Sequence, residues 1–186
     1  MDQLTIERAR RGDRDAQAAL LRGLQDLWFR FCVSQLGSAE RARDATQETG
    51  LRFLRQLPSF RGESRIESWS IGIAVNVVRE QRRAAVKQQN LAGQALAART
   101  GESLESTEGG GFGSDEIARM RAILGDLPDR QRQAVVLRFF EGLSVDETAA
   151  AMACAPGTVK ATVHQALRAI RARLDPPAGR LGKKIE

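Results

Sequence analysis

Apolar side chains recur at helical spacing along most of the chain, and no stretch of useful length alternates as a β-strand would. In the N-terminal part the repeat runs through Ala9, Ala16, Leu20, Leu24 and Leu27 and resumes at Leu51, Leu54 and Leu57. Pro58 then ends that helix. Further helical series follow Trp69 and Asp115. The pattern therefore predicts an all-α protein.

The repeat is interrupted between residues 84 and 114, where Gly, Ser, Thr and Gln predominate and no apolar period is sustained. We therefore predict two small helical domains, 1–83 and 115–174, joined by a flexible linker at 84–114 and followed by a polar tail at 175–186. The linker would set the effective concentration of one domain near the other.

The charge of the chain favours a polyanionic partner. Its 29 basic residues exceed its 23 acidic residues, and all but four of the basic residues are arginine. The first domain holds 15 basic and 11 acidic residues, and the second holds 9 and 7. Because guanidinium groups suit phosphates and base edges, the two basic domains predict a clamp on one polyanion or one large partner. A solvated Arg-rich surface is the alternative to a polyanion-binding one, and two unrelated helical modules are the alternative to a clamp.

Other functions have little support in the sequence. With two cysteines, Cys32 and Cys154, and the single histidine His164, the chain lacks the ligands of a typical metal site, and it carries no nucleophile or phosphate-loop motif. Acidic residues interrupt the N-terminus before any apolar segment of a signal peptide, and no stretch is long enough to span a bilayer. We expect a cytoplasmic protein that is not an enzyme, has no cofactor or small-molecule substrate, and does not insert into a membrane.

The clearest local motif is a helix-turn-helix. Ser144 and Glu147 form a capping box, and the small residues that follow let this helix approach another closely. Residues 154–157 are predicted to form the turn, and Thr158 the N-cap of the next helix. That helix has a predicted buried stripe of Val159, Val163, Ala166, Ile170 and Leu174. Its opposite face carries Lys160, Ala161, His164, Gln165, Arg168 and Arg171 and could enter a major groove, or could be an ordinary solvated face.

A second polar face lies on the helix after Trp69. Ile71, Ile73, Ala74, Val77 and Val78 are predicted to point inward, and Gly72, Asn76, Arg79 and Arg83 outward beside Trp69. An aromatic ring next to amide and guanidinium groups is what single-stranded nucleic acid requires. The preceding loop, 60–65, could hold an extruded base. A core tryptophan and an ordinary interhelical turn are the alternatives.

A third feature is a mixed stripe of Asp44, Gln47, Glu48 and Leu51, which share one helical face. Such a stripe suits another protein's helix, although spacing alone favours a solvated surface.

In this order, the segments resemble the extracytoplasmic-function (ECF) sigma factors of bacterial RNA polymerase over residues 7–83 and 115–174. The resemblance rests on Arg11-Gly12-Asp13, on Asp44 with Gln47-Glu48, and on Phe60-Arg61-Gly62-Glu63-Ser64 followed by Trp69 and Asn76. In the second domain it rests on Leu127-Pro128 with Arg132, Gly142-Leu143-Ser144 and Gly157-Thr158-Val159-Lys160.

The resemblance implies a factor that docks on core RNA polymerase and directs it to promoter DNA. The residues implied to contact the clamp helices of the largest polymerase subunit are Asp44, Gln47, Glu48 and Leu51. Those implied to open the minus-ten element are Phe60, Arg61, Gly62, Ser64, Trp69, Asn76, Arg79 and Arg83. Those implied to bind the minus-thirty-five element are Thr158, Lys160, His164, Gln165 and Arg168. An anti-sigma factor is implied as a further partner.

The chain departs from the family pattern in several places. Ala161, Thr162, Gln165 and Leu167 stand where the family usually has Ser, Arg, Arg and Arg, and Val75 stands where it often has Arg. Fewer phosphate contacts predict a shallower salt dependence for minus-thirty-five binding. The alternatives are a stand-alone helix-turn-helix regulator, which would need neither the Asp44 stripe nor the Trp69 face, and a protein-interaction module that no longer binds DNA.

Overall fold

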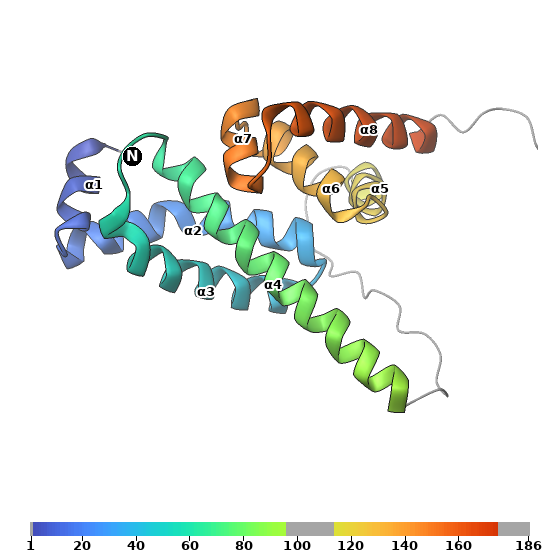
Figure 1. Ribbon diagram of the computed structural model, residues 1–186, viewed down its shortest axis with the longest axis horizontal. Helices are drawn as coiled ribbons and strands as arrows, with labels where there is room; N and C mark the ends of the chain where they lie inside the picture. Colours follow the sequence, from blue (N-terminus) through green and yellow to red (C-terminus); the bar gives the residue numbers. More distant parts are fainter. Residues whose placement is uncertain (1, 96–113, 175–186) are drawn as a thin grey trace, which may run out of the picture.

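The computed structural model describes residues 2–95 and 114–174, and in these residues it contains helices and turns without a strand (Figure 1). The first lobe consists of α1 (Gln3–Arg10), α2 (Arg14–Leu36), α3 (Ala39–Gln56) with a 3₁₀ turn at Leu57–Ser59, and α4 (Ile66–Ala95). The second consists of α5 (Ser114–Gly125), α6 (Asp129–Val135), a π-helical turn at Val136–Phe140, α7 (Val145–Met152) and α8 (Pro156–Leu174). The all-α prediction is confirmed, and no described helix is long and apolar enough to cross a bilayer.

The ends of the first helices are set by local caps. The Asp13 carboxylate accepts a hydrogen bond from the Ala16 amide at 3.0 Å and so begins α2. Gly37 ends α2 with a positive φ of 69°, and the Ser38 hydroxyl then caps α3. Pro58 lies in the 3₁₀ turn after α3, where the sequence predicts the helix to end.

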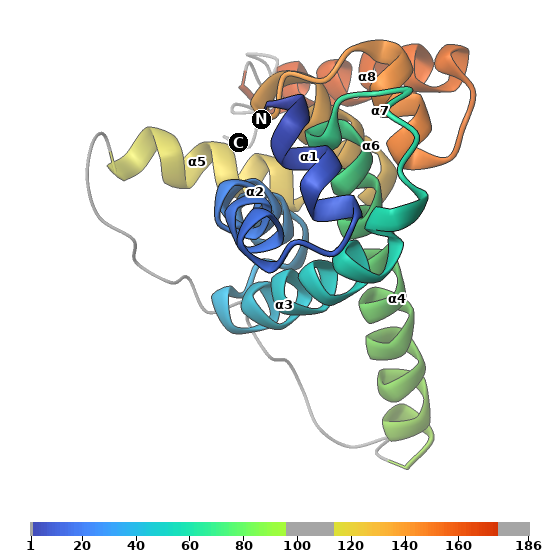
Figure 2. The same cartoon turned by 90° about the vertical axis from the view of Figure 1, so that its left-hand side faces the viewer.

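The predicted boundary between the first domain and the linker is wrong. Helix α4 continues through residues 84–95, and its last turns project away from the other helices in both views (Figures 1 and 2). These residues are mainly Ala, Gln and other good helix formers, which favour a helix even where, as at Val86, Lys87 and Gln88, the side chains are exposed. The rest of the predicted linker, 96–113, and the predicted tail, 175–186, lie outside the described residues.

Aromatic side chains hold the first lobe together. The ring of Phe53 on α3 lies 5.3 Å from Trp28 on α2 and 5.6 Å from Trp69 on α4, and Phe60 lies 5.0 Å from Trp69. Trp28 and Phe53 are fully buried. The three helices are therefore fixed relative to one another at the place where the 60–65 loop enters α4.

The two lobes share one hydrophobic core, which the sequence did not predict. The core of the first lobe continues into the second through Val136, Leu137, Leu143, Ala151 and Met152. Helix α7 packs along α4, and a Cβ atom at Gly72 would lie only 3.5 Å from the Cα atom of Ala151. The close approach predicted for the small residues of α7 is confirmed, with α4 as its partner. The predicted two helical lobes are present, and in this structure they lie against one another.

Candidate nucleic-acid and protein interfaces

Helix α3 presents the predicted polar stripe on its outer face. Asp44, Gln47 and Leu51 are exposed, with Leu51 46% accessible, and Glu48 is half-buried. The opposite face of α3 is buried in the first lobe through Ala42, Ala45, Thr49 and Phe53. An exposed leucine between acidic and amide groups is a surface on which another protein's helix can pack.

Arg52 fixes one edge of this stripe, and the sequence analysis missed it. Its guanidinium pairs with Glu48 at 2.6 Å within α3 and with Glu80 on α4 at 2.8 Å. The hydrogen bond from Arg52 lowers the pKa of the Glu80 carboxyl. The i, i+4 spacing of Glu48 and Arg52 was a signal for half of this bridge, but the partner on α4 required the fold.

The loop before α4 is anchored by an aromatic ring rather than being wholly polar. Phe60, predicted to contact DNA, is only 5% exposed and packs on Trp69, which is itself half-buried. Arg61, Gly62 and Ser64 are exposed. Gly62 has a φ of 75°, which favours glycine at the loop tip. Phe60 therefore shapes the loop, and its polar neighbours form the accessible surface.

The outward face predicted for α4 is divided. Asn76 and Arg83 are exposed as predicted. Gly72 and Arg79 instead lie against α7, where Arg79 Nη2 donates a hydrogen bond to the Met152 carbonyl oxygen at 3.4 Å. The prediction failed for these two residues because α4 has a second neighbour, the α7 helix of the other lobe.

The helix-turn-helix prediction is confirmed for α7, the turn and α8. The Ser144 hydroxyl accepts a hydrogen bond from the Glu147 amide at 3.1 Å, and the Glu147 carboxylate accepts one from the Ser144 amide at 2.8 Å. The predicted capping box is therefore present. The turn follows through Ala153, whose φ of 50° is in the left-handed region.

Helix α8 exposes the face expected to meet DNA. Lys160, His164, Gln165 and Arg168 are all exposed, and Val159, Ala166 and Ile170 are buried on the other side. Leu167, which replaces a family cation, packs on the core within the second lobe.

Two details of the α8 prediction are wrong. Thr158 is exposed but is not the N-cap, because α8 begins at Pro156 and the Thr158 amide donates to the Ala155 carbonyl at 2.9 Å. Leu174, predicted in the buried stripe, is 39% exposed because it is the last residue of the helix.

The cysteines do not form a site. Burial raises the pKa of the Cys32 thiol to about 12, so it stays protonated near neutral pH, and Cys154 is half-buried in the second lobe. Among the described residues, no group of three or more His, Cys, Asp or Glu side chains could hold a metal ion.

Comparison with known proteins assigns these helices to a family. The model of sigma-70 region 2 matches residues 20–88, and the model of sigma-70 region 4 matches residues 117–170. The chain is also 32% identical over 165 residues to the ECF RNA polymerase sigma factor SigD of Mycobacterium tuberculosis, covering 86% of this chain and 77% of that protein. The chain belongs to the ECF sigma factors. This confirms the resemblance drawn from the sequence.

Other relatives agree with this assignment. The RNA polymerase sigma-H factor of Pseudomonas aeruginosa is 32% identical, with 94% of each chain covered. In fold, this sigma factor is similar to RpoE in the complex with the anti-sigma factor NepR from Bartonella quintana, with a TM-score of 0.70, 22% identity, and 86% and 97% of the two chains covered. It is similar also to CnrH in the complex with the cytosolic domain of CnrY, with a TM-score of 0.67, 20% identity, and 95% and 99% covered.

The protein therefore directs promoter recognition in transcription initiation, and its family is generally non-enzymatic. The matched segments place α3 and most of α4 in region 2 and α6 to α8 in region 4.

Proposed function

We propose that three surfaces of this sigma factor, on α3, on the loop before α4 with α4 itself, and on α8, have separate roles. The α3 stripe of Asp44, Gln47, Glu48 and Leu51 binds core RNA polymerase. The observation that carries this assignment is the exposed Leu51 within an otherwise polar stripe. A stand-alone DNA-binding regulator would have no use for such a stripe.

The minus-ten element is assigned to the loop before α4 and to the exposed part of α4. Arg61, Gly62, Ser64, Asn76 and Arg83 offer donors and cations to a separated strand. Trp69 is half-buried, and we assign its accessible part to base stacking, with the Phe60 ring packed against it. Arg79 belongs to this surface by position, although it faces α7 in the structure.

The minus-thirty-five element is assigned to the exposed face of α8. Lys160 near the helix start reaches a phosphate or a guanine edge, Gln165 suits adenine, and Arg168 suits the backbone. Thr158 and His164 are also exposed on α8. Because Leu167 serves the core instead of DNA, we expect few phosphate contacts and a shallow salt dependence.

Regulation and location are inferred from relatives. RpoE, which shares this fold, is seen in complex with the anti-sigma factor NepR, and CnrH is seen with the cytosolic domain of CnrY, so we infer an anti-sigma factor for this chain also. Binding to core polymerase and promoter DNA places the proposed site of action in the cytoplasm.

Binding to purified core RNA polymerase tests the α3 assignment. We expect the double variant Gln47→Ala, Leu51→Ala to bind about tenfold more weakly, a loss of about 1.4 kcal/mol, because both side chains lie in the proposed contact. The matched control is Gln56→Ala, Leu4→Ala, which makes the same changes at exposed positions outside the stripe. Equal weakening of both variants, or no binding by the unaltered folded chain, would exclude the assignment.

A further inference from the structure

The ion pairs of Arg52 connect the α3 stripe to α4. The Nε atom of Arg52 lies 2.6 Å from Glu48 Oε1 on the same helix. Its two terminal nitrogens meet both carboxylate oxygens of Glu80, with Nη1 2.9 Å from Oε1 and Nη2 2.8 Å from Oε2. This two-point contact with Glu80 fixes the plane of the guanidinium, and the Nε donor in that plane holds one oxygen of Glu48.

Glu48 keeps its second oxygen for another partner. Within residues 2–95 and 114–174, no hydrogen bond or ion pair reaches Glu48 Oε2, and the side chain is 39% exposed. Asp44, Gln47 and Leu51 of the same stripe are exposed beside it. Because a carboxylate accepts several donors, a donor of the polymerase can meet Glu48 without displacing Arg52.

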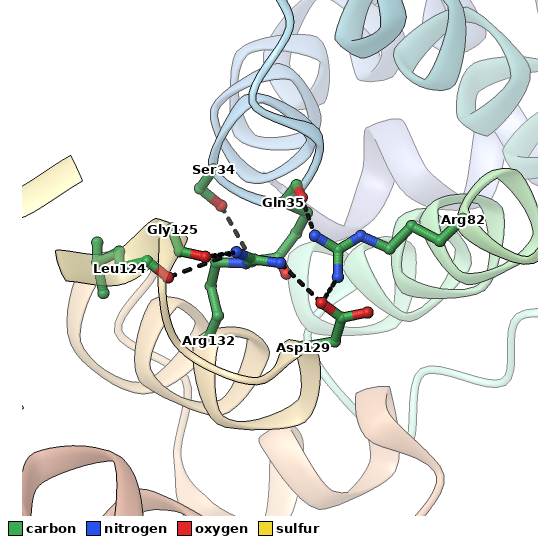
Figure 3. A network of polar contacts seen from close by, with 7 residues as sticks. All are labelled: Ser34, Gln35, Arg82, Leu124, Gly125, Asp129 and Arg132. Carbon is green, nitrogen blue, oxygen red and sulfur yellow. Dashed lines mark hydrogen bonds and ion pairs between the residues drawn. The ribbon is translucent and has the colours of Figure 1, made fainter. Parts of the chain in front are cut away.

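A second arginine network shows what a purely structural role looks like in this molecule. Figure 3 shows Arg82 between Gln35 of α2 and Asp129 of α6, where it donates to the Gln35 carbonyl and pairs with the Asp129 carboxylate. Arg132 meets the same carboxylate at 2.8 Å. None of these groups belongs to a proposed binding surface. Arg52 differs, because one of the two carboxylates that it holds is part of the α3 stripe.

The orientation of Glu48 affects how tightly the stripe can bind. A glutamate side chain that is free in solution loses rotamer freedom when an interface immobilises it, and this loss weakens binding. Arg52 restricts Glu48 before the polymerase arrives, and Glu80 in turn restricts the long side chain of Arg52. The affinity of the stripe therefore depends on a carboxylate of another helix, which need not touch the polymerase.

We propose that Arg52 is a positioning residue for polymerase binding: anchored to Glu80 on α4, it orients the Glu48 carboxylate for its contact with core RNA polymerase. This inference rests on the proposed role of the α3 stripe. A guanidinium that only screened Glu48 would instead reduce its attraction for a basic group of the polymerase. Removing the bridge would then strengthen binding, whereas positioning predicts that binding weakens.

A double-mutant cycle on polymerase binding tests the proposal. The full chain, Glu48→Gln, Glu80→Gln and the chain with both changes are each titrated against purified core RNA polymerase. We expect Glu80→Gln to weaken binding about threefold in the chain that keeps Glu48, because Arg52 is no longer held by two carboxylate oxygens. In the Glu48→Gln chain the same change should weaken binding no further, since the carboxylate to be positioned is gone.

Asp13→Asn is the matched control. It removes another arginine–carboxylate pair, in which Arg8 Nη2 lies 2.7 Å from Asp13 Oδ2, at a site outside the stripe. Asparagine still caps the start of α2. We expect unchanged affinity for polymerase. The Tm of every variant is measured as well, because a purely structural role of Glu80 would lower the Tm equally with and without Glu48.

Arg52→Lys gives a second test. Lysine keeps the positive charge, but its single ammonium group cannot hold both carboxylates with the fixed geometry of a guanidinium. We expect this variant to bind polymerase about as weakly as Glu80→Gln does.

Three results would overturn the proposal. They are equal weakening by Glu80→Gln with and without Glu48, unchanged binding by Glu80→Gln and Arg52→Lys, and tighter binding by either variant. If Glu48→Gln alone bound as tightly as the unaltered chain, the assignment of Glu48 to the polymerase contact would fail, and the role of Arg52 with it. The Glu48→Gln measurement therefore distinguishes failure of the proposed function from failure of the positioning role.

Discussion

Helices α4 and α8 both carry cations proposed to meet DNA, but α8 exposes its cations, whereas α4 exposes Arg83 and turns Arg79 against α7. α8 buries Val159, Ala166 and Ile170 on one side and exposes Lys160 and Arg168 on the other. α4 buries residues on nearly every side between Ile71 and Val78, with Asn76 as the exposed exception and Gly72 half-buried. The difference lies in the number of neighbours, because α4 packs on α2 and α3 and also on α7 of the other lobe.

This comparison shows when a polar position on a helix predicts exposure. A helix packed on one side has one apolar stripe, and its polar residues point to solvent. A helix packed on two sides needs small or adaptable residues on the second face, and glycine and arginine supply them on α4. Gly72 admits another backbone, and Arg79 keeps its guanidinium at a carbonyl while its stem is partly covered.

The largest change in stability should come from placing a charged residue in the buried part of α4. We expect Val75→Arg to destabilise the chain by about 3 kcal/mol or more, because a charge would enter the shared core without a partner. Thermal unfolding and solution X-ray scattering measure this effect. We expect a lower Tm, a larger radius of gyration because the lobes separate, and retained helicity.

Val75→Ala is the matched control, with an expected loss of about 2 kcal/mol from the cavity and no separation of the lobes. A Val75→Arg chain with the original Tm and compactness would show that α4 and α8 do not differ in the way described.

A change on the exposed face of α8 should affect DNA binding and leave the packing between the lobes intact. We expect Arg168→Ala to weaken minus-thirty-five binding by holoenzyme and to flatten the slope of log affinity against log salt by about 0.9, the value of one phosphate contact. The control is Arg173→Ala. Arg173 lies on another side of α8 from Arg168, and its guanidinium is 3.6 Å from the Asp126 carboxylate. Equal slopes for the two variants would place the α8 interface elsewhere. A changed radius of gyration for Arg168→Ala would show that this residue also affects the packing between the lobes.

The smallest effect is expected from acid. The hydrogen bond from Ser68 holds the pKa of Glu147 below its ordinary value, with the Ser144 amide adding to it and Arg65 nearby. A carboxyl with a depressed folded-state pKa stabilises above its ordinary pKa, and that stability is lost as the pH falls through the folded value. Titration from pH 7 to below 4.5 should therefore weaken the contact between the lobes by up to about 1 kcal/mol through this group.

Comparing urea unfolding of the unaltered chain and of Glu147→Gln isolates this contribution from those of Glu80 and the other carboxyls whose pKa values are lowered. The difference in stability between the two chains should shrink as the pH falls. A difference that stayed constant with pH would mean that the Ser68 contact carries no charge dependence.

Local patterns were sufficient for much of the molecule. The Ser144–Glu147 capping box, the exposed face of α8 and the α3 stripe follow from spacing within one helix. The boundary of the linker did not follow from the sequence. The apolar period is absent after residue 83, and this pattern is typical of an exposed helix as well as of a loop. The burial of Phe60 did not follow from the sequence for a similar reason, because it depends on the contact with the Trp69 ring.

By itself, the sequence determined the helices, most of their ends, and the order of motifs that makes this chain a sigma factor, because caps, turns and amphipathic stripes act over a few residues. The tertiary structure alone decided which polar residues remain accessible. The contacts of Gly72 with Ala151, Arg79 with Met152 and Arg82 with Asp129 each join residues far apart in the chain. Such pairings depend on how two amphipathic surfaces pack together. Helical periodicity in the sequence predicts each surface but does not predict which other surface it contacts.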